Sequence, residues 1–442
     1  MRAEAREPAD DALVTLLSRA PFAASGENGS QMSDARRQAR DAFLAAGLPT
    51  RRDESWRYTD LGLIRRGSFR MATPLDVARP CDVLPNLLEA GRSVGRLVFV
   101  NGGFRADLST AGPLPVGLSI VPTTQGAAIN GDAPGRFFTR GENPLVALNT
   151  AMAEDGVAIC IDGSFGRDVW LELVFLGGAT EAVACALRHL VRVGEGARLG
   201  IVEHHVALAG EAAFTNSVMQ IDVERGASLR HYRLVDGKAG SAGLIISTVR
   251  AHAAAEYEAF ALIVGGGLNR IETTVELEGA RASCRIGGAY AIAGKDICDN
   301  TIRVTHCAPK TTSRQIFRGV IDESAHAVFQ GRVIVERLAQ EADGHQLSKA
   351  LLLSGAAEID QKPALEIFAD NVKCSHGAAA GQLDPAAMFY LRSRGIPEAL
   401  ARQMLMEGFL AEVLLEVSDE AVRRQFAERI IAAIGERGKE KA

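Results

Sequence analysis

A short pattern recurs along the middle of the chain and constrains its fold more than any other feature. In each copy a small residue follows a turn and precedes an apolar residue, as in EGARL at 195–199 and RGASL at 225–229. The central residues of six copies are separated by 30, 28, 25, 45 and 32 positions and are Ala197, Ala227, Ala255, Ala280, Ala325 and Ala357. The longest interval has room for an extra turn or an insertion. Repeats of this length indicate units that stack on one another, because none can bury its apolar face alone.

Short runs rich in Val, Ile and Leu fill the region from residue 96 to 375, where helical periodicity is nearly absent. Runs such as RLVFV and VWLELVFL are bounded by Gly, Asp or Asn and suit strands of roughly 5–6 residues. Strand-only units without crossover helices favour a parallel β-helix. The same spacing also fits a β-sandwich or jelly roll with coincident turns.

Both ends of the chain have helical patterns. Asp384 is followed by proline, the arrangement of an N-cap and a first helical residue, and Ser418 is expected to cap a later helix. We therefore predict a mainly β protein with three parts. These are an N-terminal helical domain with a connector (1–95), a parallel β-helix core (96–375) and a C-terminal helical domain (376–442).

The composition excludes several classes of protein. The 442-residue chain has a net charge of −5 and no basic stripe, which argues against a nucleic-acid partner. Seven cysteines are scattered along the chain without a CxxC pair, a usage typical of free thiols in a reducing compartment. The first residues lack an apolar signal core, and no run approaches the roughly 18–20 apolar residues that span a bilayer. We expect a cytoplasmic protein without a membrane partner.

Several familiar patterns do not form a site. The glycine-rich VGGGLNR at 264–270 has Arg270 where a dinucleotide loop needs glycine, and no P-loop occurs, so no nucleotide site is assigned. The GRSVG segment at 91–95 precedes a strand, whereas a nucleophile elbow follows one. Adjacent His204 and His205 would point to opposite faces of a strand. No acidic cluster of a polysaccharide-cleaving β-helix enzyme is evident, and no catalytic residue is assigned.

One short motif carries candidate chemistry. Cys374 and His376 lie two positions apart within DNVKCSHGAAAGQLD, residues 370–384. In an extended segment such positions share a face, so a thiolate and an imidazole can converge on one ion. A structural zinc site usually takes four ligands, so other coils, a partner or sulfide must complete the set. On this spacing alone, two soft side chains at the edge of a core are the better interpretation.

The residues around this motif resemble a known family. KCSHGA (373–378), the GQLD turn and FYLRSRGI (389–396) together resemble the C-terminal signature of the SufB/SufD family of iron–sulfur cluster assembly proteins. The resemblance extends from about residue 50 to residue 435. Further matching segments are DESWRYTDL (53–61), GLNRIETTVELEGA (267–280), DNTIRVTHCAP (299–309), VFQGRV (328–333) and SKALLLSGAAEIDQKPALEI (348–367).

Two positions distinguish the branches of this family. Gly377 stands where the SufB branch tends to carry glutamate after the histidine, and Ser348 stands where that branch tends to carry a cysteine. Both missing groups are associated with sulfur acceptance and cluster building in SufB. The chain therefore resembles the SufD branch more closely and is a less suitable scaffold on its own.

The resemblance implies an architecture and partners. The core would be a right-handed parallel β-helix that meets SufB edge to edge through its late coils, about 320–372. The C-terminal helices would bind the ATPase SufC, with Arg392, Arg394 and Gly395 in the turn between the first two. The exposed edge also permits a homodimer when the protein is alone.

The resemblance also implies a role in cluster assembly. His376, and less strongly Cys374, would handle iron or a transient iron–sulfur cluster at the SufB interface, with reduced flavin associated with the complex. ATP hydrolysis would belong to SufC, so this chain is expected to be a non-catalytic scaffold subunit that supports iron acquisition. The alternative is a purely structural adaptor that positions SufB and SufC without binding metal.

Overall fold

The structure is a computed structural model that describes residues 16–17, 29–72, 88–89, 91–123, 143–163, 168–178, 181–208 and 213–440. Its strands are β1 (Arg70–Met71), β2 (Gly95–Val100), β3 (Gly103–Phe104), β4 (Thr110–Ala111), β5 (Leu118–Pro122), β6 (Val157–Ile161), β7 (Val169–Gly177), β8 (Val183–Val193), β9 (Arg198–Ala207), β10 (Ala213–Val223), β11 (Ser228–Gly237), β12 (Ala242–Ala251), β13 (Glu256–Gly265), β14 (Leu268–Leu277), β15 (Ser283–Ile292), β16 (Ile297–His306), β17 (Thr312–Ile321), β18 (His326–Val335), β19 (Ala342–Leu352), β20 (Glu358–Ile367) and β21 (Val372–Gly381). Its helices are α2 (Gly29–Ala46), the 3-10 helix η1 (Glu54–Trp56), α3 (Gly62–Arg66), α4 (Pro144–Met152), α5 (Pro385–Ser393), α6 (Glu398–Leu414) and α7 (Glu420–Glu440). Of the predicted N-terminal domain, residues 1–15, 18–28, 73–87 and 90 lie outside this description.

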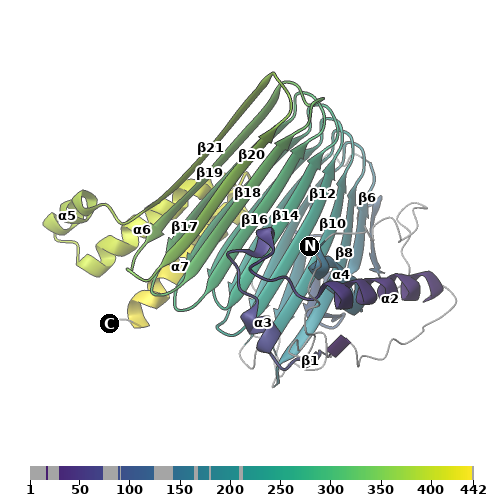
Figure 1. Ribbon diagram of the computed structural model, residues 1–442, viewed down its shortest axis with the longest axis horizontal. Helices are drawn as coiled ribbons and strands as arrows, with labels where there is room; N and C mark the ends of the chain where they lie inside the picture. The colour runs from purple at the N-terminus through teal and green to yellow at the C-terminus, as the bar shows by residue number, and fades with distance from the viewer. Residues whose placement is uncertain are drawn as a thin grey trace, which may run out of the picture.

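Two long sheets, wound from successive coils of one chain, form the body of the protein (Figure 1). The first sheet has the strand order β20-β18-β16-β14-β12-β10-β8-β6-β5, and the second has the order β21-β19-β17-β15-β13-β11-β9-β7-β2-β3. From β6 onward, consecutive strands alternate between the two sheets, so each coil contributes one strand to each sheet. Pairing is parallel from β6 and β7 onward, which confirms the predicted mainly β, parallel β-helix core with helices at both ends.

The two ends of this solenoid differ. At the N-terminal end, the short strands β3 and β4 pair antiparallel with β2, and β5 pairs antiparallel with β6. At the C-terminal end, β20 and β21 are the last strands of their sheets, and each has a neighbouring strand on one side within the described chain. The last coil, β20 with β21, is called the open end below.

The repeat in the sequence corresponds to the corner that precedes each strand. Ala197, Ala227 and Ala255 are fully buried directly before β9, β11 and β13. In the next coil the buried corner residue is Ala282, whereas Ala280 is exposed, so the predicted marker at 280 was two positions off.

The last two markers belong to the other sheet. Ala325 and Ala357 lie before β18 and β20, which are strands of the first sheet. The interval of 45 residues therefore passes from a corner of one sheet to a corner of the other and contains no insertion. The pattern predicted the right kind of fold, although its markers lie at the corners of two different sheets.

The residues at one corner of successive coils share an unusual backbone conformation. These six residues have φ values from 56° to 69°, in the left-handed region, and are Gly196, Gly226, Ala254, Arg281, Lys310 and Glu341. This conformation costs a non-glycine residue roughly 1–2 kcal/mol. Each of the six donates its backbone N–H to the carbonyl of the following coil's corner, as Ala254 does to Ala280 at 2.9 Å. These bonds keep the corners of successive coils in register.

Helices cover the outer faces of both sheets. Helix α4 packs on β8 and β10 of the first sheet, and α2 packs on α4. Helices α6 and α7 lie on the second sheet, where Phe426 contacts Phe260 with ring centroids 5.7 Å apart. Helix α5 packs on α6 and projects away from the solenoid (Figure 1). None of the described helices is long and apolar enough to cross a membrane.

The N-terminal segment 53–61, called the clasp below, lies against the outer face of the first sheet. Trp56 is buried, and the guanidinium of Arg270 lies 3.8 Å from the centre of its ring. Arg270 forms an ion pair with Asp299, and both side chains are almost completely buried. The hydroxyl of Thr59 donates to the same carboxylate, so one buried acid joins the clasp to the sheet.

The clasp also reaches the open end. The Glu54 carboxylate contacts Lys362 of β20 at 2.8 Å and Arg332 of β18 at 3.4 Å. The amide of Gln330 donates to the backbone carbonyl of Ser55 at 3.1 Å. The DESWRYTDL motif therefore has a structural role, because it binds the outer face of the last strands of the first sheet.

A buried histidine makes the stability of the fold depend on pH. His306 is completely buried, and its two ring nitrogens lie 2.8 Å from the Thr311 hydroxyl and 2.9 Å from the Ser313 hydroxyl. Burial lowers the pKa of His306 to about 4. The unfolded chain, with a histidine pKa near 6.5, therefore binds a proton first as the pH falls. The contribution of the neutral, buried His306 to the free energy of unfolding is fully present above about pH 6.5 and is lost as the pH falls toward 4.

Between these limits, we expect His306→Gln to reduce the fall in the free energy of unfolding by about 1.4 kcal/mol for each pH unit. The measurement is the free energy of unfolding in urea at several pH values for both proteins. Parallel curves for the wild type and the variant would contradict this assignment of the pH dependence.

Candidate functional site at the open end of the solenoid

The open end exposes side chains that inner coils keep buried. No residue of β20 is fully buried, and most residues of β21 are exposed, whereas every second residue at the start of β19 is buried. The reason is geometric, because the interior of the last coil has no further coil stacked on it. Polar side chains on this interior face are therefore available to a partner.

His376 lies on the interior face of the open end. It pairs in register with Gln346 of β19, which is completely buried inside the solenoid. Residues in register on neighbouring parallel strands project to the same face of the sheet. His376 is exposed because β21 is the last strand of its sheet.

Cys374 lies on the same interior face and is half-buried. It pairs in register with Gly344 and packs against a small apolar cluster that includes Val333 and Val335. Burial raises the pKa of the Cys374 thiol, with a further increase from Asp343 and an opposing hydrogen bond from the backbone of Gly344. The free protein therefore favours the thiol over the thiolate, and the thiol is the poorer metal ligand.

Other groups on this face were not found from the sequence. The side-chain amide of Gln361 in β20 donates to the hydroxyl and the carbonyl of Ser348 at 2.8 and 3.0 Å. Gln346 lies one coil below His376, and Gln315 lies one coil below Gln346. A signal for this column was present, since these three residues are 31 and 30 positions apart, which is one coil length.

The described residues do not form a complete metal site by themselves. Among the described residues, no group of three or more His, Cys, Asp or Glu side chains could hold a metal ion. The two adjacent histidines do not share a face: His205 contacts Glu203 at 2.6 Å, and His204 is buried without a hydrogen-bond partner. Cys374 and His376 do share a face, as the spacing predicted, and would need further ligands from outside.

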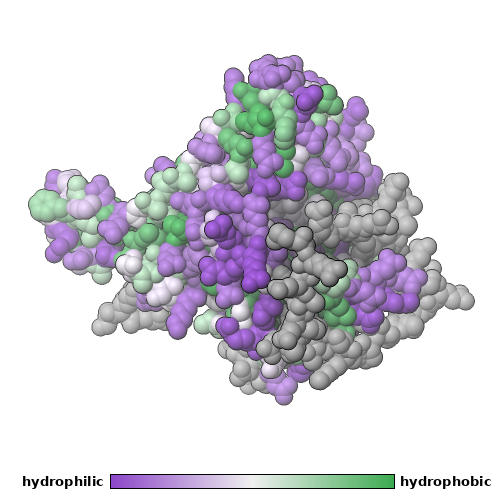
Figure 2. Space-filling model, in the orientation of Figure 1, coloured by the Kyte–Doolittle hydropathy of each residue, from purple (hydrophilic) through white to green (hydrophobic). Residues whose placement is uncertain are grey.

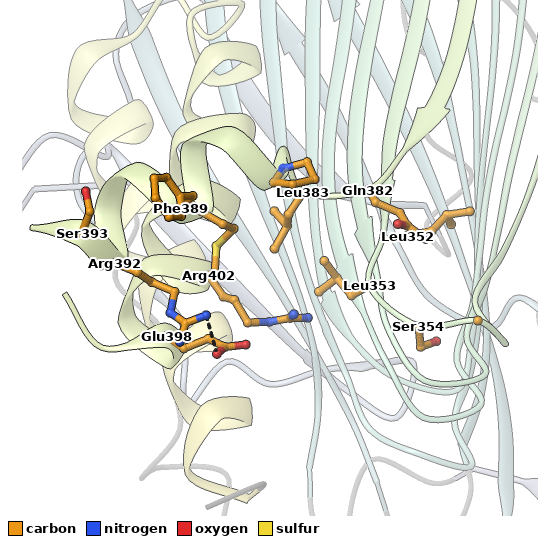
Figure 3. A pocket seen from close by; sticks show the side chains of 13 residues that line it. Leu352, Leu353, Ser354, Gln382, Leu383, Phe389, Arg392, Ser393, Glu398 and Arg402 are labelled. Carbon is orange, nitrogen blue, oxygen red and sulfur yellow. Dashed lines mark ion pairs between the residues drawn. The ribbon is translucent and has the colours of Figure 1, made fainter. Parts of the chain in front are cut away.

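A second surface feature lies between the C-terminal helices and the open end. The turn after β19, the linker before α5, and helices α5 and α6 enclose a groove of about 780 Å³ (Figure 3). Phe389 and Arg392 of α5 line one side, Leu353 lies across from them, and Arg402 extends from α6 toward the solenoid (Figure 3). Arg392 contacts Glu398 at 3.4 Å, with both side chains largely exposed.

The turn between α5 and α6 is well defined. Gly395 has a φ of +84°, a left-handed conformation that ends α5, and the Ile396 N–H donates to the Leu391 carbonyl. The Arg394 guanidinium lies 5.2 Å from the centre of the Tyr390 ring. The three residues predicted for partner docking, at 392, 394 and 395, are therefore grouped on one exposed turn.

Exposed apolar side chains accompany both features. Phe368, which follows β20, is 61% exposed, and Phe389 of α5 is 74% exposed. Figure 2 shows apolar surface at the end of the stack where β20 passes into β21, and over α5. Large exposed apolar groups are unusual on a monomer surface and mark interaction sites when they are grouped.

These features define a class of protein: a parallel β-solenoid with one open end and exposed terminal helices, suited to assembly with other chains. Two family models match the chain: SUF system FeS cluster assembly, SufBD core domain, over residues 175–409, and SufBD protein N-terminal region, over residues 11–165.

Full-length relatives give the same result. The chain is 31% identical to the iron-sulfur cluster assembly protein SufD of Escherichia coli, over 92% of this chain and 94% of that protein. It is also 31% identical to the iron-sulfur cluster assembly SufBD family protein slr0076 of Synechocystis, over 89% of each. It is 30% identical to protein ABCI7, chloroplastic, of Arabidopsis thaliana, over 91% of this chain and 86% of that protein. The chain therefore belongs to the SufD family of iron–sulfur cluster assembly proteins.

Proposed function

We propose that this chain is the SufD subunit of a cytoplasmic SufBCD scaffold for iron–sulfur cluster assembly, and that its open end pairs with SufB. The observation that carries the proposal is the interior position of His376 on the last strand. A terminal strand presents a row of unpaired N–H and C=O groups that a strand of another solenoid satisfies. Such pairing would extend both sheets and bring His376 to the junction.

The exposed helices suit a second partner. Helix α5 has no buried residue and presents Phe389, together with the turn that contains Arg392, Arg394 and Gly395. We propose this surface as the docking site of SufC, the ATPase of the complex. Exposed aromatic and arginine side chains are the residue types that dominate binding at protein interfaces.

A mechanical route connects the two surfaces. Helix α6 is attached to β17, because Arg318 forms an ion pair with Glu412 and donates to the Phe409 carbonyl at 3.2 Å. ATP-driven dimerisation of two SufC subunits would pull on α5 and α6 and, through this attachment, on the late coils. A small rigid-body shift at the junction would then expose His376 to iron, a transition of the shear type.

Iron and the nascent cluster are the cargo of this site. Neutral imidazole is a competent ligand for iron, so His376 would supply one ligand and SufB would supply the others. Cys374 is the weaker candidate because packing favours its protonated form. Reduced flavin would be carried by the complex, and we assign no residue of this chain to it. ATP hydrolysis would take place in SufC, which makes this chain a non-catalytic subunit.

We expect the His376→Ala complex to assemble normally but to yield roughly tenfold less cluster. Loss of a residue that only hydrogen-bonds to a metal ligand already lowers metal affinity by roughly 10- to 100-fold, and loss of a ligand itself should cost at least as much. Cluster yield is measured by absorbance after reconstitution of the purified complex with iron and sulfide. Cys374→Ala should have a smaller effect. His345→Ala is a matched control, because its ring contacts Ser375 at 2.8 Å on the outer face of the same sheet. An unchanged yield for His376→Ala would remove this residue from the mechanism.

A second function is favoured by the incomplete ligand set. Since the described residues hold no group of three or more metal-ligating side chains, a structural adaptor that positions SufB and SufC is the alternative. Iron titration of the SufB–SufC complex with and without this chain separates the two. Equal iron binding in both titrations supports the adaptor, and an additional site in the presence of this chain supports the iron-handling role.

A further inference from the structure

The last strands of the two sheets present unequal edges at the open end. Within a parallel sheet, successive residues of a strand direct their backbone N–H and C=O groups alternately to its two sides. At the start of β20, the Glu358 N–H donates to the Ala325 carbonyl at 3.0 Å. Just after β20, the Phe368 N–H donates to the Val335 carbonyl at 2.8 Å. Even-numbered residues of β20 therefore bond to β18, and odd-numbered residues face the free edge.

A proline interrupts the free edge of β20. The residues of this strand whose backbone faces the edge are Ile359, Gln361, Pro363, Leu365 and Ile367. Proline has no N–H, and a strand accepts it at a free edge because no bond to a neighbouring strand is lost there. A strand added to β20 would find a gap in the middle of the row of donors. Its carbonyl opposite Pro363 would stay unpaired.

The free edge of β21 has no such gap. In β19, the Asp343 N–H donates to the Thr311 carbonyl at 3.0 Å, so odd-numbered residues of β19 bond to β17 and even-numbered ones bond to β21. By the register of β19 with β21, odd-numbered residues of β21 complete this ladder. The residues that face the free edge all carry an N–H and are Val372, Cys374, His376, Ala378 and Ala380.

The gap in the edge of β20 lies across the interior from His376. Gly331 and Gln346 face each other inside the solenoid, since a Cβ added at Gly331 would lie 2.9 Å from the Gln346 Nε2. Pro363 pairs in register with Gly331, and His376 pairs in register with Gln346. Pro363 and His376 therefore occupy facing positions in the last coil.

We infer that a partner solenoid is held mainly by β21, and that Pro363 makes the first sheet the side on which the junction opens. This inference rests on the proposed pairing of the open end with SufB. The edge of β21 offers an unbroken row of donors, whereas the row of β20 is divided by Pro363. An unpaired buried carbonyl weakens the ladder locally, so opening is more frequent there. The side that opens is the wall across from His376, the proposed iron ligand.

The test is hydrogen–deuterium exchange of the full-length protein, alone and in the assembled complex with SufB and SufC, read by mass spectrometry. Assembly should protect residues 372–381 of β21 more than residues 358–367 of β20. We expect the edge amides of β20 to exchange roughly tenfold faster in the complex than those of β21.

A variant restores the missing donor. Pro363→Val keeps a similar volume and adds an N–H, so it should slow the exchange of β20 and tighten the binding of SufB by roughly 2- to 10-fold. Leu365→Val is the matched control, because it changes a side chain on the same edge and the same face and has the N–H in both forms. Its exchange and affinity should stay within about twofold of the wild type.

Equal protection of the two strands in the wild-type complex, or stronger protection of β20, overturns the inference and leaves the pairing intact. An affinity of Pro363→Val no higher than that of Leu365→Val overturns it as well. If assembly protects neither strand, the proposed pairing of the open end fails and the inference fails with it. The exchange comparison needs only the wild-type protein, so it decides the question even where a variant does not fold.

Discussion

Asp299→Ala should lower the free energy of unfolding by about 3 kcal/mol, the largest stability effect we expect from a single substitution. Removal of this carboxylate leaves the buried guanidinium of Arg270 without its main partner. Glu272 still contacts another nitrogen of that guanidinium at 3.2 Å, which places the effect at the lower end of the range for buried pairs. The hydroxyl of Thr59 loses its acceptor as well, so the clasp should detach before the solenoid unfolds.

Urea unfolding monitored by tryptophan fluorescence measures this effect, because Trp56 is one of two tryptophans and lies under Arg270. Asp360→Ala is the matched control. Its carboxylate contacts His326 at 2.8 Å but is 40% exposed, so its loss should cost about 1 kcal/mol or less. Equal destabilisation by the two substitutions would show that the buried ion pair does not hold the clasp.

Ala378→Asp should weaken the proposed association with SufB at least about 100-fold, which corresponds to about 2.7 kcal/mol. Ala378 pairs in register with Ser348, which is completely buried, so its side chain faces the interior of the open end. An aspartate there is solvated in the free protein and becomes a buried charge without a partner once a second solenoid covers it. Folding of the free chain should be unchanged, as measured by circular dichroism.

The neighbouring substitution Ala379→Asp serves as the control. Ala379 lies on the same strand and pairs with Lys349, but its side chain points to the outer face. Isothermal titration with purified SufB should give affinities for Ala379→Asp within a few-fold of the wild type. If both substitutions weaken binding equally, or if Ala378→Asp has no effect, the partner does not pair through the interior of the open end.

Most of the fold could be predicted from the sequence, but the strand lengths could not. Strands β8 to β21 contain 10 or 11 residues, about twice the expected length. Some of the apparent breaks in the apolar runs are polar residues that are buried and bond to one another. Within β9 and β11, for example, Glu203 contacts both His231 and Arg233 inside the solenoid. Pairing across coils makes such residues compatible with a buried strand, and this information is absent from any single strand.

The helix caps show the same limit at a smaller scale. Asp384 caps α5 as predicted, since its carboxylate accepts the Ala386 N–H at 2.8 Å. The prediction of Ser418 as the cap of α7 was wrong, because Asp419 accepts the N–H of Val422 instead. The Ser418 hydroxyl lies 3.3 Å from the Tyr232 hydroxyl of the solenoid, a tertiary contact that local sequence does not reveal.

The candidate site was predictable in part. The shared face of Cys374 and His376 follows from strand geometry and is confirmed by the register with β19. Its location inside an open end required the stacking order of the coils. Gln346 and Gln361 were missed because an isolated glutamine carries no local signal, and only the coil period brings them near His376.

The unequal ends of the solenoid limit how many solenoids can join end to end. Short antiparallel strands finish the N-terminal end, and such edges are poor templates for addition of a further chain. A solenoid with two open ends could add copies without limit and form a fibre. With one usable end per chain, two solenoids that join end to end leave no site for a third, so growth stops at a pair.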